Sequence, residues 1–160
     1  MKTVIALLVA LASASPAFAQ TNINLGGISA DPSAAVEISA DNLSVDQDTG
    51  TAVFSGNVVI GQGALRLSAG SVRVVYAEET GDIAQLMASG GVTFVTDTQA
   101  AEAASADYNL TTGQLTLSGN VLLSQGASAL SADKMTVDLT SGTAQMSGRV
   151  RTVFQQDGGN

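Results

Sequence analysis

Apolar and polar residues alternate along most of the chain between Val36 and Phe154. The alternation is plain in Leu65-Arg66-Leu67, Val72-Arg73-Val74 and Leu115-Thr116-Leu117. Because successive side chains of a β-strand point to opposite faces, a period of two predicts strands with one buried face. Gly, Asp and Ser interrupt these segments at intervals of about ten residues, which is typical of sandwiches, barrels and rolls of short antiparallel strands. The sequence therefore predicts an all-β fold.

One stretch, residues 99–106, has the Ala and Glu content of a helix. It is too short for a convincing helix, and a strand pattern follows it directly. We therefore expect a loop or a strand there.

The chain also repeats itself in units that begin with Ser-Ala-Asp or Ser-Ala-Gly and end with Ser-Gly-x-Val. The beginnings lie at 39–41, 68–70, 105–107 and 131–133, and the ends at 55–58, 89–92, 118–121 and 147–150. Each unit predicts a hairpin, and the Gly near its end permits a bulge or bend that lets the strands curl. Since a single hairpin cannot bury its apolar face, we expect the units to stack on one another.

The start of the chain has the layout of a secretory signal peptide. Met1-Lys2 is a short positive start, Thr3 to Ala14 is almost entirely apolar, and Ala17-Phe18-Ala19 is a small-x-small cleavage site. The apolar run is shorter than the roughly 20 residues of a membrane span, although a retained N-terminal anchor is the alternative. The expected organisation is a signal peptide over 1–19, a flexible leader over 20–35, a β-roll over 36–154 and a flexible tail over 155–160.

Removal of residues 1–19 takes away Lys2 and leaves five Lys and Arg against fourteen Asp and Glu, a net charge of −9. The five basic residues are Arg66, Arg73, Lys134, Arg149 and Arg151. So acidic a chain is a poor binder of nucleic acid, which requires clustered Lys and Arg. Arg66 and Arg73 are expected to face solvent. Arg149 and Arg151 are expected on a solvated last strand, with a partner or an anionic head group as the alternative.

Candidate catalytic residues are scarce because the chain has neither Cys nor His. Their absence excludes thiol nucleophiles, His-based triads and the usual zinc sites. No Gly-x-Ser-x-Gly motif is present, and the acidic residues are scattered singly. We therefore expect no enzymatic activity, no cofactor and no metal.

The segment Asp46-x-Asp48-x-Gly50 resembles part of a calcium loop, but Asn57 stands where that loop needs a bidentate Glu. A hairpin turn capped by Asp side chains is the favoured interpretation. Asp41, Asp107 and Asp133 recur at the starts of units, where we expect them to bond to turn backbone.

The apolar face of the predicted strands has two interpretations. In a closed roll it is a core, whereas in a roll that stays open along one side it is a groove for an apolar ligand. Both need the same alternation, so the pattern does not distinguish them.

In their order and spacing, these units resemble the OstA-like domain of the LptA/OstA-like family of periplasmic lipopolysaccharide-transport bridge proteins. The resemblance lies in Val36–Asp41 followed by Ala52–Val58, in Ala104–Tyr108 followed by Leu117–Val121, and in Gly148–Val153. It implies a twisted antiparallel β-jelly roll, open at both ends, whose apolar interior shields the acyl chains of lipid A. The acidity of this chain and an irregular segment between Tyr76 and Gly90 depart from the family pattern.

The resemblance also implies partners and a site. The partners are lipopolysaccharide, an LptC-like inner-membrane protein, an LptD-like outer-membrane translocon and further copies of the chain, stacked head to tail. The implied lipid A-binding residues are Val36, Ile38, Phe94, Tyr108 and Leu110. Three other functions stay open: an LptC-like anchored partner, a structural β-solenoid or adhesin-like surface protein, and a small secreted hydrolase.

Overall fold

The computed structural model describes residues 23–24 and 33–154, which form thirteen β-strands of one antiparallel sheet. The expected signal peptide (1–19) and tail (155–160) lie outside the described residues, as does most of the expected leader. The strands are β1 (Ile23–Asn24), β2 (Val36–Ser39), β3 (Asn42–Asp46), β4 (Thr51–Gln62), β5 (Leu65–Tyr76), β6 (Ile83–Ser89), β7 (Val92–Val95), β8 (Gln99–Ala103), β9 (Ser105–Asn109), β10 (Gln114–Gln125), β11 (Ser128–Asp138), β12 (Thr143–Ser147) and β13 (Arg151–Val153). In this part of the chain, no helix is long and apolar enough to span a membrane.

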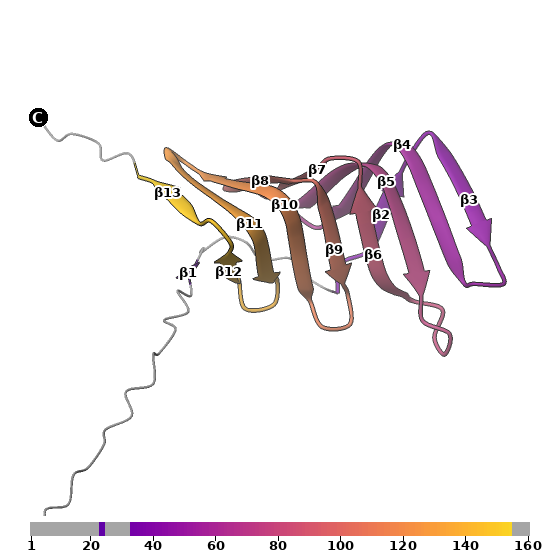
Figure 1. Cartoon of the computed structure of the whole chain (residues 1–160). Helices are drawn as coiled ribbons and strands as arrows, with labels where there is room; N and C mark the ends of the chain where they lie inside the picture. The colour runs from indigo at the N-terminus through magenta and orange to yellow at the C-terminus, as the bar shows by residue number, and fades with distance from the viewer. Residues whose placement is uncertain (1–22, 25–32, 155–160) are drawn as a thin grey trace, which may run out of the picture.

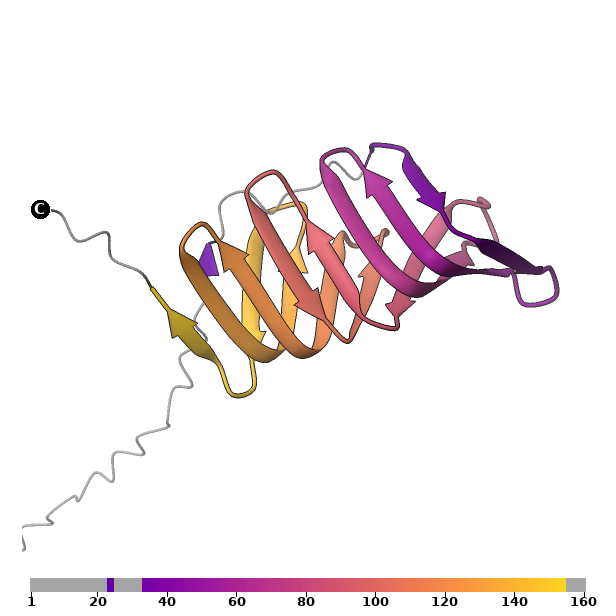
Figure 2. The ribbon, with the colours of Figure 1, turned by 90° about the horizontal axis from the view of Figure 1, so that it is seen from above.

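The sheet folds over on itself into two layers, because the four long strands β4, β5, β10 and β11 each bend and run through both (Figures 1 and 2). In what we call the upper layer, the strand order is β2-β4-β5-β7-β8-β10-β11-β13. In the lower layer it is β3-β4-β5-β6-β9-β10-β11-β12-β1. This arrangement is the β-jelly roll that the family resemblance implies, and it confirms the all-β fold that the alternation predicts.

The bends lie where the Ser-Gly-x-Val motifs predict them. The pairing of β4 with β5 shifts register between Ser55 and Val58, and that of β10 with β11 shifts between Ser118 and Val121. At Gly119-Asn120 the chain has φ values of 83° and 47°, in the left-handed region that Gly and Asn tolerate best. The conformation bulges one strand relative to its partner and turns the chain from one layer into the other.

At these bends, the carbonyl of the Gly accepts a backbone hydrogen bond from a residue at the start of a unit. The amide of Asp41 donates to the carbonyl of Gly56, and the amide of Asp133 donates to the carbonyl of Gly148, both at 2.9 Å. In the third unit this position belongs to Ala104, whose amide donates to Gly119, and not to Asp107. The Ser-Ala-Asp of the third unit is therefore out of register with the others.

The expectation that these three carboxylates bond to turn backbone is wrong. Asp41 accepts from Asn57 Nδ2 at 2.9 Å, and Asp107 accepts from Gln85 Nε2 at 2.8 Å. Asp133 accepts from the guanidinium of Arg149. Each carboxylate thus bonds to a side chain of a neighbouring segment, and that of Asp107 joins the paired strands β9 and β6.

Two uncertain segments of the sequence prove to be strands. Residues 99–106 form β8 and the start of β9, which decides between loop and strand. The segment between Tyr76 and Gly90, irregular in sequence, contains β6, which pairs with both β5 and β9. Only the connection from Ala77 to Asp82 lacks strand structure there.

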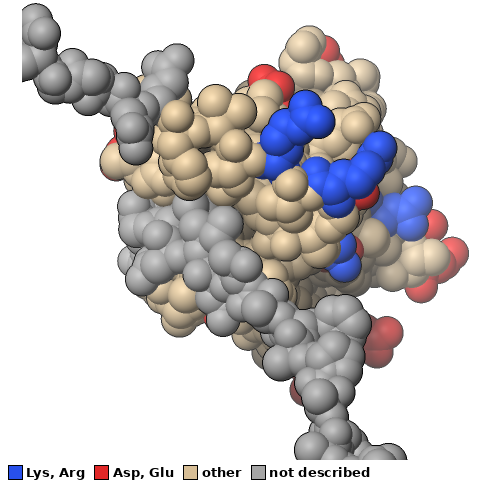
Figure 3. All heavy atoms as spheres, turned by 60° about the vertical axis from the view of Figure 1, so that its left-hand side comes forward, with Lys and Arg blue, Asp and Glu red and all other residues tan. Residues whose placement is uncertain are grey.

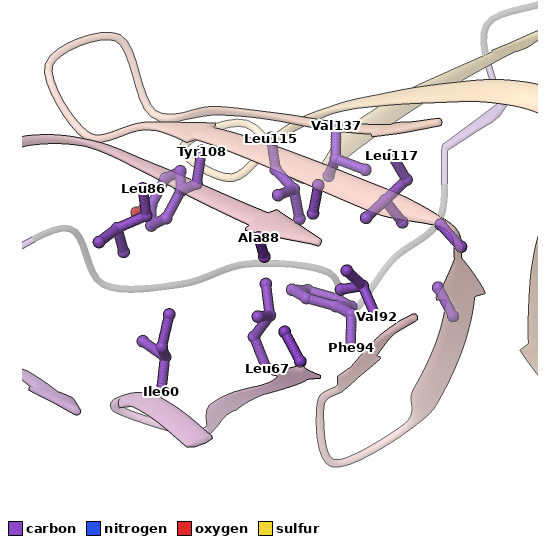
Figure 4. Close-up of a cluster of buried hydrophobic side chains, with 14 of the residues drawn as sticks. Ile60, Leu67, Leu86, Ala88, Val92, Phe94, Tyr108, Leu115, Leu117 and Val137 are labelled. Atoms are coloured by element: carbon purple, nitrogen blue, oxygen red, sulfur yellow. The ribbon is translucent and has the colours of Figure 1, made fainter. Parts of the chain in front are cut away.

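The core fills the space between the layers along the roll. Figure 4 shows Ile60, Leu67 and Phe94 of the upper layer pointing toward Leu86, Tyr108 and Leu115 of the lower layer. Burial follows the predicted period of two, as in β5, where buried and exposed residues alternate from Leu65 to Gly70. Arg66 and Arg73 are exposed on the outer face, as predicted.

Candidate functional site

The two layers are joined by the bends along one side of the roll and end in hairpin turns along the other. The turns of the upper layer are 63–64, 96–98 and 126–127, and those of the lower layer are 47–50, 77–82, 110–113 and 139–142. We call the boundary between these two rows of turns the seam. It is the side on which the layers can separate without breaking any pairing between the described strands.

Between the layers near the seam lies a small cavity of about 10 Å³. Its lining consists of Val36, Ile60, Gln62, Leu65, Leu67, Leu86, Ala88, Ala106 and Tyr108. A volume of this size holds about one water molecule, whereas ligand pockets measure about 300–1,000 Å³. The interior is therefore a packed core in this conformation.

A much larger hollow of about 580 Å³ opens at the seam beside this cavity. Ala34, Val36 and Gln62 line it from the upper layer, and Ala77, Thr80, Gly81, Asp82, Ile83, Ala84, Leu110 and Thr111 line it from the lower layer. Val36 and Gln62 line both the hollow and the cavity. These two side chains stand between the hollow and the apolar interior, and we call the hollow the mouth.

The five residues predicted for lipid binding fall into two groups. Val36, Tyr108 and Leu110 surround the cavity or its mouth. Ile38 is half-buried, pairs with Ile60 and packs against the core. Phe94 is 0 % exposed and lines neither space, so it is a fully packed core residue in this conformation.

Gln62 is not among the site residues that the sequence predicts. Gln62 is buried on the inner face of β4, where its Oε1 accepts a hydrogen bond from Tyr108 Oη at 3.0 Å and its Nε2 donates to the carbonyl of Ala34 at 3.2 Å. Its position could have been found from the period of two, because Gln62 continues the inward series of Val58 and Ile60. Burial also raises the pKa of Tyr108 above its ordinary value.

The calcium-like segment proves to be the capped turn that the sequence favours. Asp46 Oδ1 accepts hydrogen bonds from the amides of Asp48 and Thr49, at 2.9 and 3.2 Å. Nowhere among residues 23–24 and 33–154 do three or more acidic side chains gather as a metal site would require.

Two comparisons with known proteins gave matches. Residues 37–143, about two thirds of the chain, match the family described as LptA/(LptD N-terminal domain) LPS transport protein. Among solved structures, the chain is similar to LptH of Pseudomonas aeruginosa, described as the LptA-homologous periplasmic component of the conserved lipopolysaccharide transport device. The TM-score is 0.71 at 18 % sequence identity, and the match covers 79 % of this chain and 99 % of LptH. No curated protein sequence matches the chain significantly.

Proposed function

The chain belongs to the LptA/LptD N-terminal domain family of lipopolysaccharide transport proteins, and we propose that it carries lipopolysaccharide through the periplasm from the inner to the outer membrane. The acyl chains of lipid A would lie between the two layers, and the sugar and phosphate groups would remain outside. In this proposal the chain binds and passes its cargo without catalysing a reaction. Family membership does not favour the LptC-like or β-solenoid alternatives.

The observation that carries this proposal is the apolar interior with a mouth at the seam. Val36 and Tyr108 line the cavity, and Leu110 lines the mouth, which makes them the first apolar side chains an entering acyl chain would meet. Ile38 and Phe94 lie further along the same inner face. Burial of acyl chains against such side chains is favourable by about 0.8 kcal/mol per methylene group.

Entry of the lipid requires the layers to move apart, since the cavity is far smaller than an acyl chain. The bends form a continuous hinge along one side, while no pairing between the described strands crosses the seam. Parting at the seam would replace contacts between the layers by contacts with acyl chains. The mouth around Val36 and Gln62 is the place where this separation would begin.

Periplasmic location and partners form part of the same proposal. The similar protein from Pseudomonas aeruginosa is a periplasmic component, which supports export through a cleaved signal peptide over 1–19. The outer edges of β2, β3 and β13 have no strand partner among the described residues. Free edges template strand addition, so they would join copies head to tail and connect the ends of the stack to LptC-like and LptD-like proteins.

Photo-crosslinking to lipopolysaccharide tests the proposed site. A photoreactive residue replaces Val36, which lines the cavity, or Val59, which faces outward on β4 at 39 % exposure. We expect labelling of lipopolysaccharide from position 36 and not from position 59. Labelling from neither position in folded protein, or equally from both, would refute binding between the layers.

A further inference from the structure

Among the described residues, each end of the roll has one part of the repeat without its usual neighbour. One end has a bend that lacks a second unit start beside it, and the other end has a unit start that lacks a second bend. Between the ends, every bend lies between two unit starts: the bend at Gly119-Asn120 has Ala104 on one side and Asp133 on the other. The last bend, Gly148-Arg149, has Asp133 on one side, and none of the strands within 23–24 and 33–154 lies on its other side. In the part of the chain that the structure describes, the first unit start, Ala40-Asp41, has a bend on one side only.

We propose that Arg149 and Arg151 form a docking surface for the acidic first strand of a second copy, with Glu37 and Asp41 as the groups they receive. This inference rests on the proposed function, in which copies stack head to tail, and specifies the contact. Continuing the internal register places Asp41 of the next copy opposite the bend at Gly148-Arg149.

The strand register gives the remaining pairs. Within the chain, Ala132 of the fourth unit pairs with Val121, and Ser131 pairs with Leu122. By the same offsets, Ala40 of the next copy pairs with Val150, and Ser39 pairs with Arg151. The strands run antiparallel there, as all neighbours in the upper layer do. Glu37 then lies diagonally across from Arg151, within reach of a long side chain.

Charge is distributed along the roll as this contact requires. Residues 33–65 contain four acidic side chains and no Lys or Arg, whereas residues 128–154 contain three basic and two acidic ones. Figure 3 shows Lys and Arg side chains gathered at the end of the roll that holds β12 and β13. Arg149 and Arg151 line a surface hollow of about 300 Å³ there, together with Asn120, Val121, Ser131, Ala132 and Asp133.

The backbone at Arg149 is a second indication. Its φ is 44°, a left-handed conformation that the equivalent Asn57 and Asn120 adopt easily and that Arg disfavours. Strain of this kind is commonly retained where a side chain has a function. Arg149 already donates to Asp133 at 2.7 Å, with its side chain 82 % exposed, so other donors of the guanidinium remain accessible to a second carboxylate.

Apolar side chains at the two ends point toward the interior in the same register. Val150 and Phe154, which are 49 % and 73 % exposed, fall in the inward phase of the last strand. The half-buried Ile38 and Val36 fall in the inward phase of β2. Pairing in the upper layer would cover these side chains and continue the apolar interior into the next copy. In the lower layer, β1 already occupies the edge of β12 at Thr143 and Ala144, so the contact uses the bend and the upper layer.

Charge reversal tests the contact in the full mature chain, by sedimentation velocity in the absence of lipid. Glu37→Arg or Arg151→Glu places like charges at every junction, and we expect each variant alone to associate about tenfold more weakly than the unaltered protein. In an equimolar mixture, every junction between one variant and the other brings opposite charges together. Recovery of association in the mixture supports the proposal, and failure to recover overturns it.

Two further variants separate an effect on association from an effect on folding or on lipid binding. Arg149→Asn suits the left-handed backbone, so it is expected to unfold at the same or a higher temperature while associating more weakly. Glu102→Arg, on an exposed position of β8 away from both ends, is the control that leaves association unchanged. All variants should crosslink lipopolysaccharide from position 36 like the unaltered protein. Loss of crosslinking throughout would refute the proposed function, whereas unchanged association of Glu37→Arg and Arg151→Glu would refute only the docking contact.

Discussion

Tyr108 and Gln62 join the two layers of the roll through a buried hydrogen bond, in which Tyr108 Oη on β9 donates to Gln62 Oε1 on β4 at 3.0 Å. Both side chains line the apolar cavity beside the seam. Gln62 also lines the mouth, so the bond lies where the layers would first separate. It stabilises the closed interior and must break, or be replaced, when the layers part there.

Replacing Tyr108 with Phe should destabilise the protein by about 1–3 kcal/mol, because Gln62 Oε1 is left buried without a donor. The urea midpoint of unfolding measures this loss. Tyr76→Phe is the matched control, since Tyr76 is exposed at the end of β5 and its change should have little effect. Equal destabilisation by the two substitutions would contradict a role for the buried bond.

The same substitution should increase lipid loading if the bond helps to hold the seam closed. We expect photo-crosslinking from position 36 to proceed faster in Tyr108→Phe than in the unaltered protein, with no change in Tyr76→Phe. A slower or unchanged rate would mean that the bond does not limit entry of the lipid.

Stability should fall at alkaline pH through Tyr108. Burial raises its pKa above the ordinary value of 10.0, so the unfolded chain loses the phenolic proton before the folded chain does. As the pH rises through 10.0, proton release therefore favours unfolding, and the stability that Tyr108 contributes is lost. Urea unfolding at several pH values should show the difference between the unaltered protein and Tyr108→Phe shrinking above about pH 9. A difference that grows with pH would contradict this assignment.

The bends should be intolerant of a side chain at Gly119. A Cβ there would lie 2.8 Å from the Cβ of Ala104, at a φ of 83°, so Gly119→Ala combines a steric clash with backbone strain. We expect a loss of about 2 kcal/mol or more. Gly126→Ala is the control, because its φ is 56° but no atom lies within 4 Å of the added Cβ. Comparable thermal midpoints for the two variants would show that contact at the bend is unimportant.

A charge at the mouth should oppose lipid binding. Val36→Asp places an unpaired carboxylate on the apolar path, and crosslinking from position 38 should fall by about tenfold. Val59→Asp makes the same change on the outer face of β4 and should leave crosslinking unaltered. Phe94 is less suitable for this test, since a charge at a site with 0 % exposure would unfold the protein. Circular dichroism establishes that both Val variants fold.

The repeat could be predicted from the sequence, but the equivalence of its copies could not. Ser105-Ala106-Asp107 has the same letters as Ser39-Ala40-Asp41, yet Ala104 takes the place opposite the bend. Asp107 lies within β9, where its carboxylate accepts from Gln85 of β6. The motif specifies which local conformations are accessible, whereas the burial of neighbouring side chains selects the register.

Gln62 shows a similar limit at the candidate site. Beside Gly63 it has the composition of a turn, and it lies at the end of β4. Its burial is tolerable because Tyr108, on a strand of the opposite layer and 46 residues later in the chain, donates to its Oε1, and because the carbonyl of Ala34 accepts from its Nε2. The residues of the mouth were likewise predictable from family resemblance only in part, because Ala77 to Ala84 reach it through a connection between strands.

The sequence by itself determined the strands, the bends and the fact that each strand has one buried and one exposed face. Alternation such as Leu115-Thr116-Leu117 needs one buried face, and Gly119-Asn120 adopts a left-handed bend with little strain. The tertiary structure decided that the interior is packed and that a hollow at the seam adjoins it at Val36 and Gln62. The physical reason is that alternation and backbone preference act between neighbours in the chain, whereas cavities, partners of buried polar groups and sheet edges depend on strands brought together from distant segments.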